Sequence, residues 1–204
     1  MLISRIVLAL TVTVLGWSVG SALAQTSPAR AALSRADSAF LKQAAENGHM
    51  EIEGSRIALE KSTTPKVREF AQTMITDHQQ VGAELKTLAT GKGVEVPNEP
   101  SLVQRTRVKL LSTNEGDELS RRYVEMLGVE AHQETIELFE KSAANATDPD
   151  VKAFAMKMLP ALQRHLTHAR ELQTSLAGNR QGSGTAGSTS KAGTTDRASA
   201  PSAK

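Results

Sequence analysis

Four long amphipathic segments constrain the fold of this 204-residue chain more than any other feature. Thr64-Pro65 and Asp148-Pro149 are residue pairs that commonly start helices, because proline fits the first helical turn and Thr or Asp caps it. Apolar residues recur after each pair at spacings of three and four, the period of one helix face. The pattern predicts long helices over residues 38–62, 64–91, 115–146 and 148–177.

The connection over residues 94–114 separates these segments into two pairs. It contains Pro97 and Pro100, and a short helix is expected over residues 102–111, with a capping box from Ser112 to Glu115 opening the third long helix. Tight turns within each pair and one long connection between the pairs predict an all-α, ferritin-like four-helix bundle. The bundle would consist of two helical hairpins joined by a long crossover with a short helix.

Both ends of the chain differ in composition from this central part. Residues 1–24 have an early Arg5, a short apolar run and small residues at Ala24, which is typical of an export signal cleaved between Ala24 and Gln25. We therefore expect a signal peptide at 1–24, a flexible leader at 25–36, the bundle at 37–177 and a disordered, low-complexity tail at 178–204. The expected location is the periplasm or the exterior of the cell.

Composition narrows the class of partner. The chain has no cysteine, which excludes disulfides and thiolate metal ligands, and its 24 Lys and Arg nearly balance its 22 Asp and Glu. A nucleic-acid-binding domain would show a basic stripe on its folded part. This sequence shows no such stripe, so no nucleic-acid partner is predicted. No segment of the mature chain is long and apolar enough to span a membrane. Association of the basic tail with the envelope surface stays open, as does the oligomeric state.

Four ionisable residues fall on the apolar faces of the four long helices: Glu51, His78, His132 and His165. A buried polar group without a partner costs roughly 1–3 kcal/mol, so helices normally keep such groups outside. Glu51 and His78 lie almost equally far from the turn at Thr64, and His132 and His165 almost equally far from Asp148. If the two turns lie at opposite ends, all four residues meet near the middle of the bundle.

One carboxylate and three imidazoles suit a divalent transition metal such as Zn, Fe or Mn. We therefore predict that Glu51, His78, His132 and His165 bind a metal ion or a small ligand, with Asp77 and His168 as outer-shell partners that orient the rings. In the alternative, the protein has a structural or envelope-stress interaction role and its Glu/His network only specifies packing.

No catalytic residues are predicted. Glu46 and His49 have the Glu-x-x-His spacing of di-iron bundles, but both are expected on the outer face. A di-iron oxidoreductase is the weakest of the three hypotheses, because such sites need more inward carboxylates than this sequence supplies.

Four segments of the chain, at residues 40–45, 74–78, 131–141 and 159–166, resemble the corresponding segments of one bacterial exported family. This family is catalogued as domain of unknown function 4142. The Asp77-His78 pair and the Leu-Pro-x-Leu-x-x-His pattern ending at His165 carry most of this resemblance. It implies a ferritin-like fold, an exported protein, and an acid and three histidines at the four positions named above. Where the family commonly has Asp-His on the third long helix, this chain has Ala131-His132.

Overall fold

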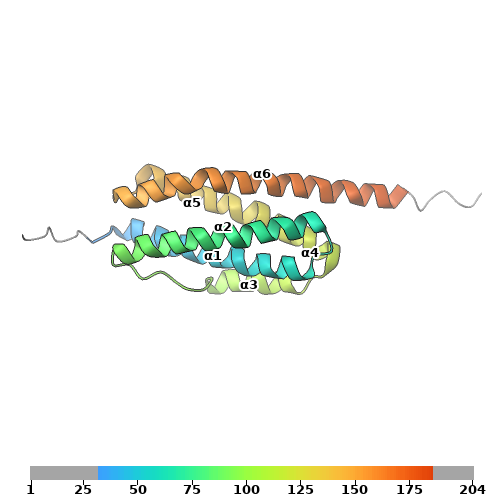
Figure 1. Ribbon diagram of the computed structural model, residues 1–204, viewed down its shortest axis with the longest axis horizontal. Helices are drawn as coiled ribbons and strands as arrows, with labels where there is room; N and C mark the ends of the chain where they lie inside the picture. The colour runs from blue at the N-terminus through green and yellow to red at the C-terminus, as the bar shows by residue number, and fades with distance from the viewer. Residues whose placement is uncertain (1–31, 186–204) are drawn as a thin grey trace, which may run out of the picture. The chain divides into compact units, whose positions relative to one another are not determined.

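The computed structural model of the protein describes residues 32–185, and the described part is a bundle of long helices (Figure 1). The all-α helical bundle predicted from the sequence is confirmed. The expected signal peptide, its cleavage site and most of the leader lie outside the described residues. The elements, in chain order, are α1 (Arg35–Lys61), α2 (Pro65–Gly91), α3 (Leu102–Ser112), α4 (Gly116–Tyr123), the π-helix η1 (Val124–Ala131), α5 (His132–Asn145) and α6 (Pro149–Thr185).

Two helical hairpins make up the bundle. In the first, α1 and α2 are joined by a short turn, and α2 starts at Pro65 as predicted. In the second, α5 and α6 are joined by an equally short turn, and the Asp148 carboxylate accepts hydrogen bonds from the backbone of Asp150 and Val151 at the start of α6. The two turns lie at opposite ends of the bundle (Figure 1). This is the arrangement that the predicted meeting of the four polar residues requires.

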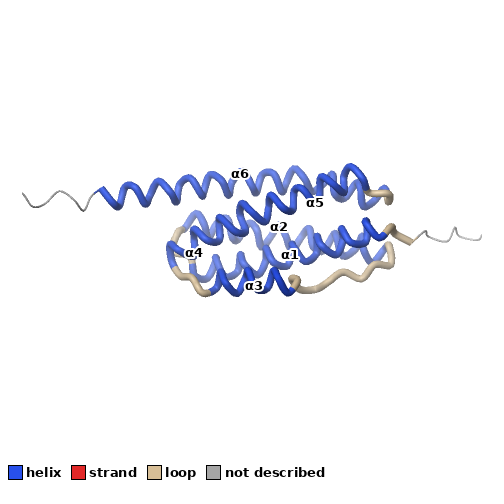
Figure 2. The backbone as a smooth tube through the Cα atoms, turned by 180° about the vertical axis from the view of Figure 1, so that it is seen from behind, coloured by secondary structure: helices blue, strands red, loops and turns tan. Residues whose placement is uncertain are grey.

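The crossover between the hairpins contains α3, which packs against α1 (Figure 2). A capping box opens α3, with Ser101 Oγ accepting from the Gln104 backbone and Gln104 Oε1 accepting from the Ser101 backbone. The capping box expected at Ser112 to Glu115 was wrong, because Glu115 is the N-cap of α4 but its side chain makes no capping hydrogen bond. Ser112 is instead the last residue of α3, where its hydroxyl donates a hydrogen bond to the Lys109 carbonyl at 2.7 Å.

The third long helix is not the uninterrupted α-helix expected over residues 115–146. It divides into α4, the eight-residue π-helix η1 and α5, with the change back to α-helical pairing at His132. A π-helix pairs residues five apart and accommodates extra backbone within the same helical path. The buried side chains consequently repeat every four residues, at Leu119, Tyr123, Leu127, Ala131 and Thr135, and the prediction of one continuous α-helix did not allow for this spacing.

Helix α6 is longer than predicted. It was expected to end before Gly178 but continues to Thr185, about two helical turns further. At the other end, α1 begins at Arg35 inside the expected leader, where Ser34 Oγ accepts a hydrogen bond from the Asp37 backbone. The part of the tail from residue 186 onward lies outside the described residues.

The core consists of two apolar clusters. One includes Phe70, Tyr123 and Leu127, and extends toward the turn between α1 and α2. The other includes Phe40 and Phe139, and extends toward the turn between α5 and α6. We call them the turn-1 cluster and the turn-2 cluster.

A polar clamp closes the turn-2 end of the bundle. The buried Asp37 carboxylate accepts hydrogen bonds from the Thr147 hydroxyl at 2.6 Å and from the Asp148 backbone at 3.0 Å. Lys92, which follows α2, bridges the carboxylates of Asp148 and Asp150 at 2.7 and 2.6 Å. These contacts tie the start of α1 and the end of α2 to the second hairpin.

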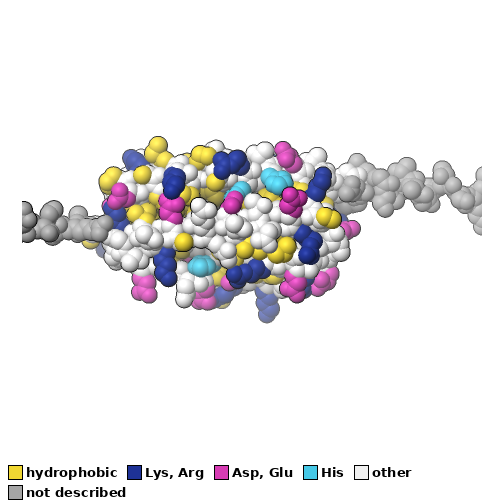
Figure 3. All heavy atoms as spheres, in the orientation of Figure 1, with side chains coloured by type: hydrophobic (Ala, Val, Ile, Leu, Met, Phe, Trp, Pro, Cys, Tyr) yellow, Lys and Arg dark blue, Asp and Glu magenta, His cyan; other side chains and the backbone are white. Residues whose placement is uncertain are grey.

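Acidic and basic side chains are interspersed on the face drawn in Figure 3, with no extended patch of one sign. Among the described residues, no helix combines the length and apolar character needed to cross a membrane.

Candidate metal centre

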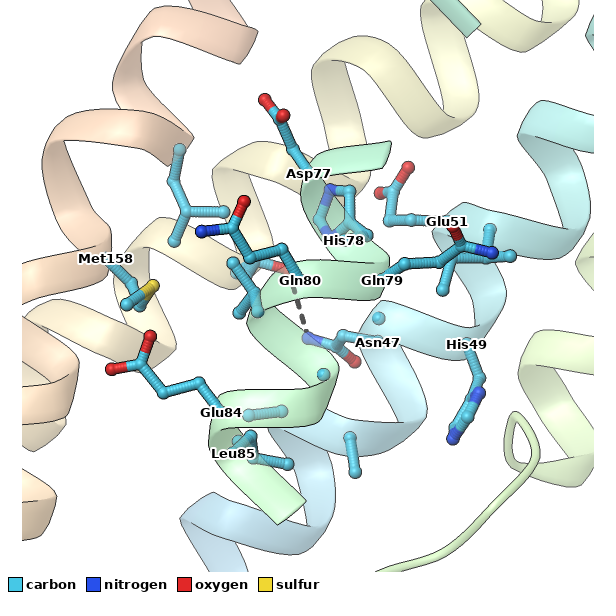
Figure 4. A pocket seen from close by; sticks show the side chains of 18 of the residues that line it. Asn47, His49, Glu51, Asp77, His78, Gln79, Gln80, Glu84, Leu85 and Met158 are labelled. Carbon is cyan, nitrogen blue, oxygen red and sulfur yellow. Dashed lines mark hydrogen bonds between the residues drawn. The ribbon is translucent and has the colours of Figure 1, made fainter. Parts of the chain in front are cut away.

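The four polar residues predicted to face the interior are all buried. The exposed fractions are 2% for Glu51, 8% for His78, 1% for His132 and 9% for His165. They come from α1, α2, the start of α5 and α6 respectively. Figure 4 shows Glu51 and His78 on neighbouring helices at one end of a cavity.

The three histidines form a compact triad. Their ring centroids are 5.7 Å apart for His78 and His132, 5.7 Å for His78 and His165, and 5.5 Å for His132 and His165. One nitrogen of each ring lies within 4.8 Å of the corresponding nitrogens of the other two. Around a tetrahedral zinc ion, ligand nitrogens are about 3.4 Å apart. Small side-chain rotations would therefore bring the three nitrogens to metal-binding distances.

Two of the rings are held by a hydrogen bond on the side away from the triad. His132 Nδ1 donates to the carbonyl oxygen of Leu127 at 2.8 Å, and His165 Nε2 donates to the Asp77 carboxylate at 2.8 Å. Each bond fixes a tautomer and leaves the lone pair of the other nitrogen, His132 Nε2 or His165 Nδ1, free. Metal-binding histidines almost always have such a partner on their second nitrogen.

The free nitrogens have no hydrogen-bond partner. Among the described residues, the buried side-chain nitrogens and oxygens without a partner are His78 Nε2, His132 Nε2, His165 Nδ1 and both carboxylate oxygens of Glu51. Every unpartnered buried atom in that part of the chain thus belongs to the four predicted residues. Native proteins leave few buried polar groups unpaired, so a concentration of them calls for an explanation.

Glu51 lies beside the triad rather than within it. Its Oε1 is 3.6 Å from His132 Nδ1, the nitrogen already bonded to Leu127, and Glu51 does not belong to the group of three histidines with nitrogens within 4.8 Å of one another. One helical turn further along α1, Ser55 bonds the Tyr123 hydroxyl at 2.8 Å. The structure therefore brings Glu51 into contact with His132, whereas the sequence analysis placed it in a single four-residue set.

Burial keeps this group of residues neutral. Desolvation raises the pKa of Glu51 well above its usual value and lowers the pKa of His132 to about 4. Burial and the neighbouring rings also lower the pKa of His78 strongly. The pKa of His165 is lowered by burial too, although the Asp77 carboxylate opposes that effect. The imidazoles are thus in the unprotonated form that metal binding needs.

The two predicted outer-shell residues differ in position. Asp77 contacts His165 directly, as described above. His168 is exposed, and its ring packs edge-on against Phe70 with centroids 5.0 Å apart, so the structure does not join it to the triad. His49, expected on the outer face, is half-buried and lines the cavity.

Two features of the site were missed from the sequence. The Leu127 carbonyl, which holds His132, lies in the π-helix, and no residue pattern marks where a carbonyl will accept a side-chain donor. A cavity of about 570 Å³ adjoins the triad. The glycines at 48 and 82 line it and were its one visible signal, since glycine inside a helix is costly without a packing reason.

Comparison with known proteins agrees with this architecture. The model of the family described as Domain of unknown function (DUF4142) matches residues 22–172, a span that includes all four buried polar residues. The chain belongs to the DUF4142 family. No protein of curated function matches it.

Solved structures of other proteins share the fold. A DUF305 fragment from Deinococcus radiodurans has 15% identity and a TM-score of 0.61, covering 72% of this chain and 99% of that one. A DUF305 protein of Streptomyces coelicolor, described as a candidate secreted protein, has 16% identity and a TM-score of 0.60, covering 70% and 94%. A conserved hypothetical protein from Mycobacterium tuberculosis has 18% identity and a TM-score of 0.55, covering 68% and 91%. At these identities the likeness concerns the fold alone.

Proposed function

We propose that this DUF4142 protein is exported and binds a divalent transition-metal ion through His78, His132 and His165. The observation that carries the proposal is the convergence of unpartnered buried atoms on this one place. A metal ion would coordinate His78 Nε2, His132 Nε2 and His165 Nδ1 together. It would thereby offset the cost of burying three lone pairs away from water.

The hydrogen bonds behind the rings support metal binding over simple packing. A histidine that only fills space needs no particular free nitrogen. Here the Leu127 carbonyl and the Asp77 carboxylate leave His132 Nε2 and His165 Nδ1 as lone-pair donors on two rings whose centroids lie 5.5 Å apart. Three neutral imidazoles suit Zn, Fe, Mn and their neighbours, and they leave a coordination position for a further ligand.

Glu51 would supply negative charge next to the metal ion. In the metal-free protein, burial disfavours its ionised form, which is why its pKa is raised. A bound dication a few ångströms away would favour ionisation instead. Metal binding should therefore release a proton from Glu51.

Export is supported by the amino-terminal pattern that resembles a cleaved signal, with the expected cut between Ala24 and Gln25. The similar protein of Streptomyces coelicolor is itself described as a candidate secreted protein. Amino-terminal sequencing of the protein recovered from the periplasm or medium would test this part.

Elemental analysis of untagged protein tests the metal site, and isothermal titration with Zn²⁺, Fe²⁺ and Mn²⁺ then gives the affinities. We expect about one metal ion per chain, and replacement of His165 by Ala should weaken binding at least about 100-fold, because one of three ligands is lost. His168→Ala is the matched control, since that histidine lies one turn away on α6 but is exposed and packs on Phe70. It should leave the affinity unchanged.

The structural alternative makes the opposite prediction. If the histidines only specify packing, no transition metal will co-purify or bind. Replacing His78 and His165 by Leu will then raise the melting temperature, because apolar groups remove the unpartnered atoms. That combination of results would refute the metal site.

Asp77 tests the orientation of the site separately. Asp77→Ala should weaken metal binding by about 10- to 100-fold, the range typical of partners that hold a ligating histidine. Asp77→Asn keeps an acceptor for His165 Nε2 and should lose less. Equal affinity in all three proteins would show that Asp77 does not orient the ring.

A further inference from the structure

The histidine triad is one end of a much larger cavity. The cavity measures about 570 Å³, far more than one metal ion fills, and it is within the size range of small-molecule sites. His78, His132, His165 and Glu51 are among its lining residues. Figure 4 shows Glu51 and His78 at one end, and Glu84, Leu85 and Met158 toward the other.

The cavity extends from the triad in one direction on all four helices. Its lining on α2 runs from His78 to Leu85 and beyond, and on α5 from His132 to Phe139. On α1 and α6, which run the opposite way, the lining other than Ile52 lies before Glu51 and before His165, back to Ala44 and Lys157. On all four helices, the lining residues therefore extend from the triad toward the turn between α5 and α6. The distance from His78 to Leu85 is seven residues, about 10 Å, which is the length of an extended chain of about eight carbons.

The walls away from the triad are mostly apolar. They include Ala45 on α1, Val81 and Leu85 on α2, Phe139 on α5 and Leu162 on α6. Behind Phe139 lie the rings of Phe40 and Phe154, with centroids 5.0 and 6.1 Å from it. Glu84 and Lys157 also line this end, but they pair with each other at 2.6 Å and are partly exposed to solvent. The buried wall is therefore polar at the triad and apolar at the turn-2 cluster, a polarity that matches a small amphipathic molecule.

We propose that the cavity binds a medium-chain carboxylic acid, with its carboxylate on the metal ion and its alkyl chain along the bundle axis. The inference rests on the proposed metal site. Three neutral imidazoles leave the dication with a positive charge that Glu51 only half neutralises, and carboxylate oxygen is an ordinary ligand for such ions. The chain gains free energy by leaving water for the apolar walls.

Two wall residues offer space for substitutions that would block the chain. Gly48 on α1 lines the cavity, and a Cβ atom built on it would meet nothing within 4 Å. Ala161 lines the cavity from α6, and neither it nor Gly48 is among the proposed metal ligands. A leucine at either position would occupy part of the volume without removing a metal ligand. Gly178, which also has open space around it and is exposed on α6, is the matched control.

The experiment is isothermal titration of the zinc-loaded full chain with octanoate, 1-octanol and tetradecanoate. Octanoate should bind, and 1-octanol should bind about tenfold more weakly because it lacks the charged group. Tetradecanoate should also bind more weakly, because its chain exceeds the length of the cavity. Gly48→Leu and Ala161→Leu should each weaken octanoate binding by about tenfold or more through steric exclusion, while Gly178→Leu leaves it unchanged.

Zinc titration of the same proteins separates the two proposals. Gly48→Leu and Ala161→Leu should keep the zinc affinity of the unsubstituted chain. If zinc does not bind the unsubstituted chain, the proposed function itself fails. If zinc binds but octanoate does not, only the present inference fails. Octanoate binding that is equally strong without zinc, or that neither leucine variant weakens, would overturn it as well.

Discussion

The two halves of the bundle on either side of the histidine triad are packed differently, and their glycines show the difference. In the turn-1 half, a Cβ on Gly128 would lie 2.9 Å from the Ala169 Cβ, and one on Gly54 would lie 2.0 Å from a methyl carbon of Leu127. In the other half, a Cβ on Gly48, which is half-buried and lines the cavity, would meet nothing within 4 Å. The same residue type therefore allows helices to touch in one half and borders open space in the other.

This contrast separates stability from binding within one small bundle. The turn-1 half has the density of an ordinary protein core, where Phe70, Tyr123 and Leu127 are almost completely buried. The turn-2 half contains the cavity, and the clamp of Asp37 and Lys92 ties its end together. A bundle that keeps space for a ligand at one end can compensate by close packing at the other.

The largest expected effect on stability comes from a bulky substitution in the turn-1 half. Gly128→Leu should lower the free energy of unfolding by at least about 3 kcal/mol, because the rigid Ala169 Cβ cannot move away without moving α6. Urea denaturation followed by circular dichroism measures this. Gly178→Leu, at an exposed site with open space, should change stability by less than about 0.5 kcal/mol. Similar losses in both variants would show that the two halves do not differ in packing as described.

Acid should destabilise the metal-free protein at the layer between the halves. The pKa of His132 is about 4 in the folded protein, against about 6.5 in an unfolded chain. The unfolded state therefore binds the proton first, and the stability that this histidine contributes is complete above pH 6.5 and is lost as the pH falls toward 4. A loss of about 3 kcal/mol corresponds to this shift.

Glu51 opposes part of that loss. Its raised pKa means that the folded state takes up a proton at Glu51 before the unfolded state does, which favours folding as the pH falls. Glu51→Gln removes this term, so its stability should fall more steeply between pH 6.5 and pH 4 than that of the unsubstituted chain. Urea midpoints measured across this range test both statements, and flat profiles would contradict them.

Loss of the polar clamp in the turn-2 half should have a smaller effect on stability. Asp37→Ala should cost about 2 kcal/mol, because the Thr147 hydroxyl and the Asp148 backbone N–H lose a buried charged acceptor. Thermal unfolding is a suitable measurement. Glu140→Ala, which removes an exposed acid on α5, is the control and should have little effect. An equally small effect for Asp37→Ala would mean that packing alone closes this end.

The smallest expected effect is a gain in stability from a substitution in the turn-2 half. Gly82 is exposed within α2 and has free space for a Cβ, so Gly82→Ala should stabilise the protein by about 1 kcal/mol through helix propensity. Chemical denaturation resolves a change of this size. A decrease in stability would indicate that the space beside Gly82 is not free.

Features set by local residue chemistry could be predicted from the sequence. Pro65 and Pro149 mark the starts of two long helices, and both starts are where they were expected. The distance of His78 and His132 from their nearest turns placed them at one level, and the rings do meet. Helical rise is constant, so counting residues from a well-defined turn gives a reliable height.

Features that depend on contacts between helices could not be predicted. Counting placed Glu51 at the right level, but the side-chain torsion angles decide whether its carboxylate faces the free nitrogens or His132 Nδ1, and it faces the latter. Ser101 and Ser112 are each followed three residues later by Gln or Glu, and only the backbone conformation distinguishes the real capping box at Ser101. The cavity depends on how far apart four helices pack, which no single segment determines.

The π-helix before His132 makes the backbone pairing of this stretch a functional constraint. If the same residues from Val124 to Ala131 adopted ordinary α-helical pairing, the extra residue would rotate everything beyond it by about 100° relative to α4. His132 would then leave the interior unless the hairpin of α5 and α6 turned with it. Natural insertions should therefore be tolerated in the crossover near Pro97 far better than in this stretch, although both segments lie outside the four polar positions.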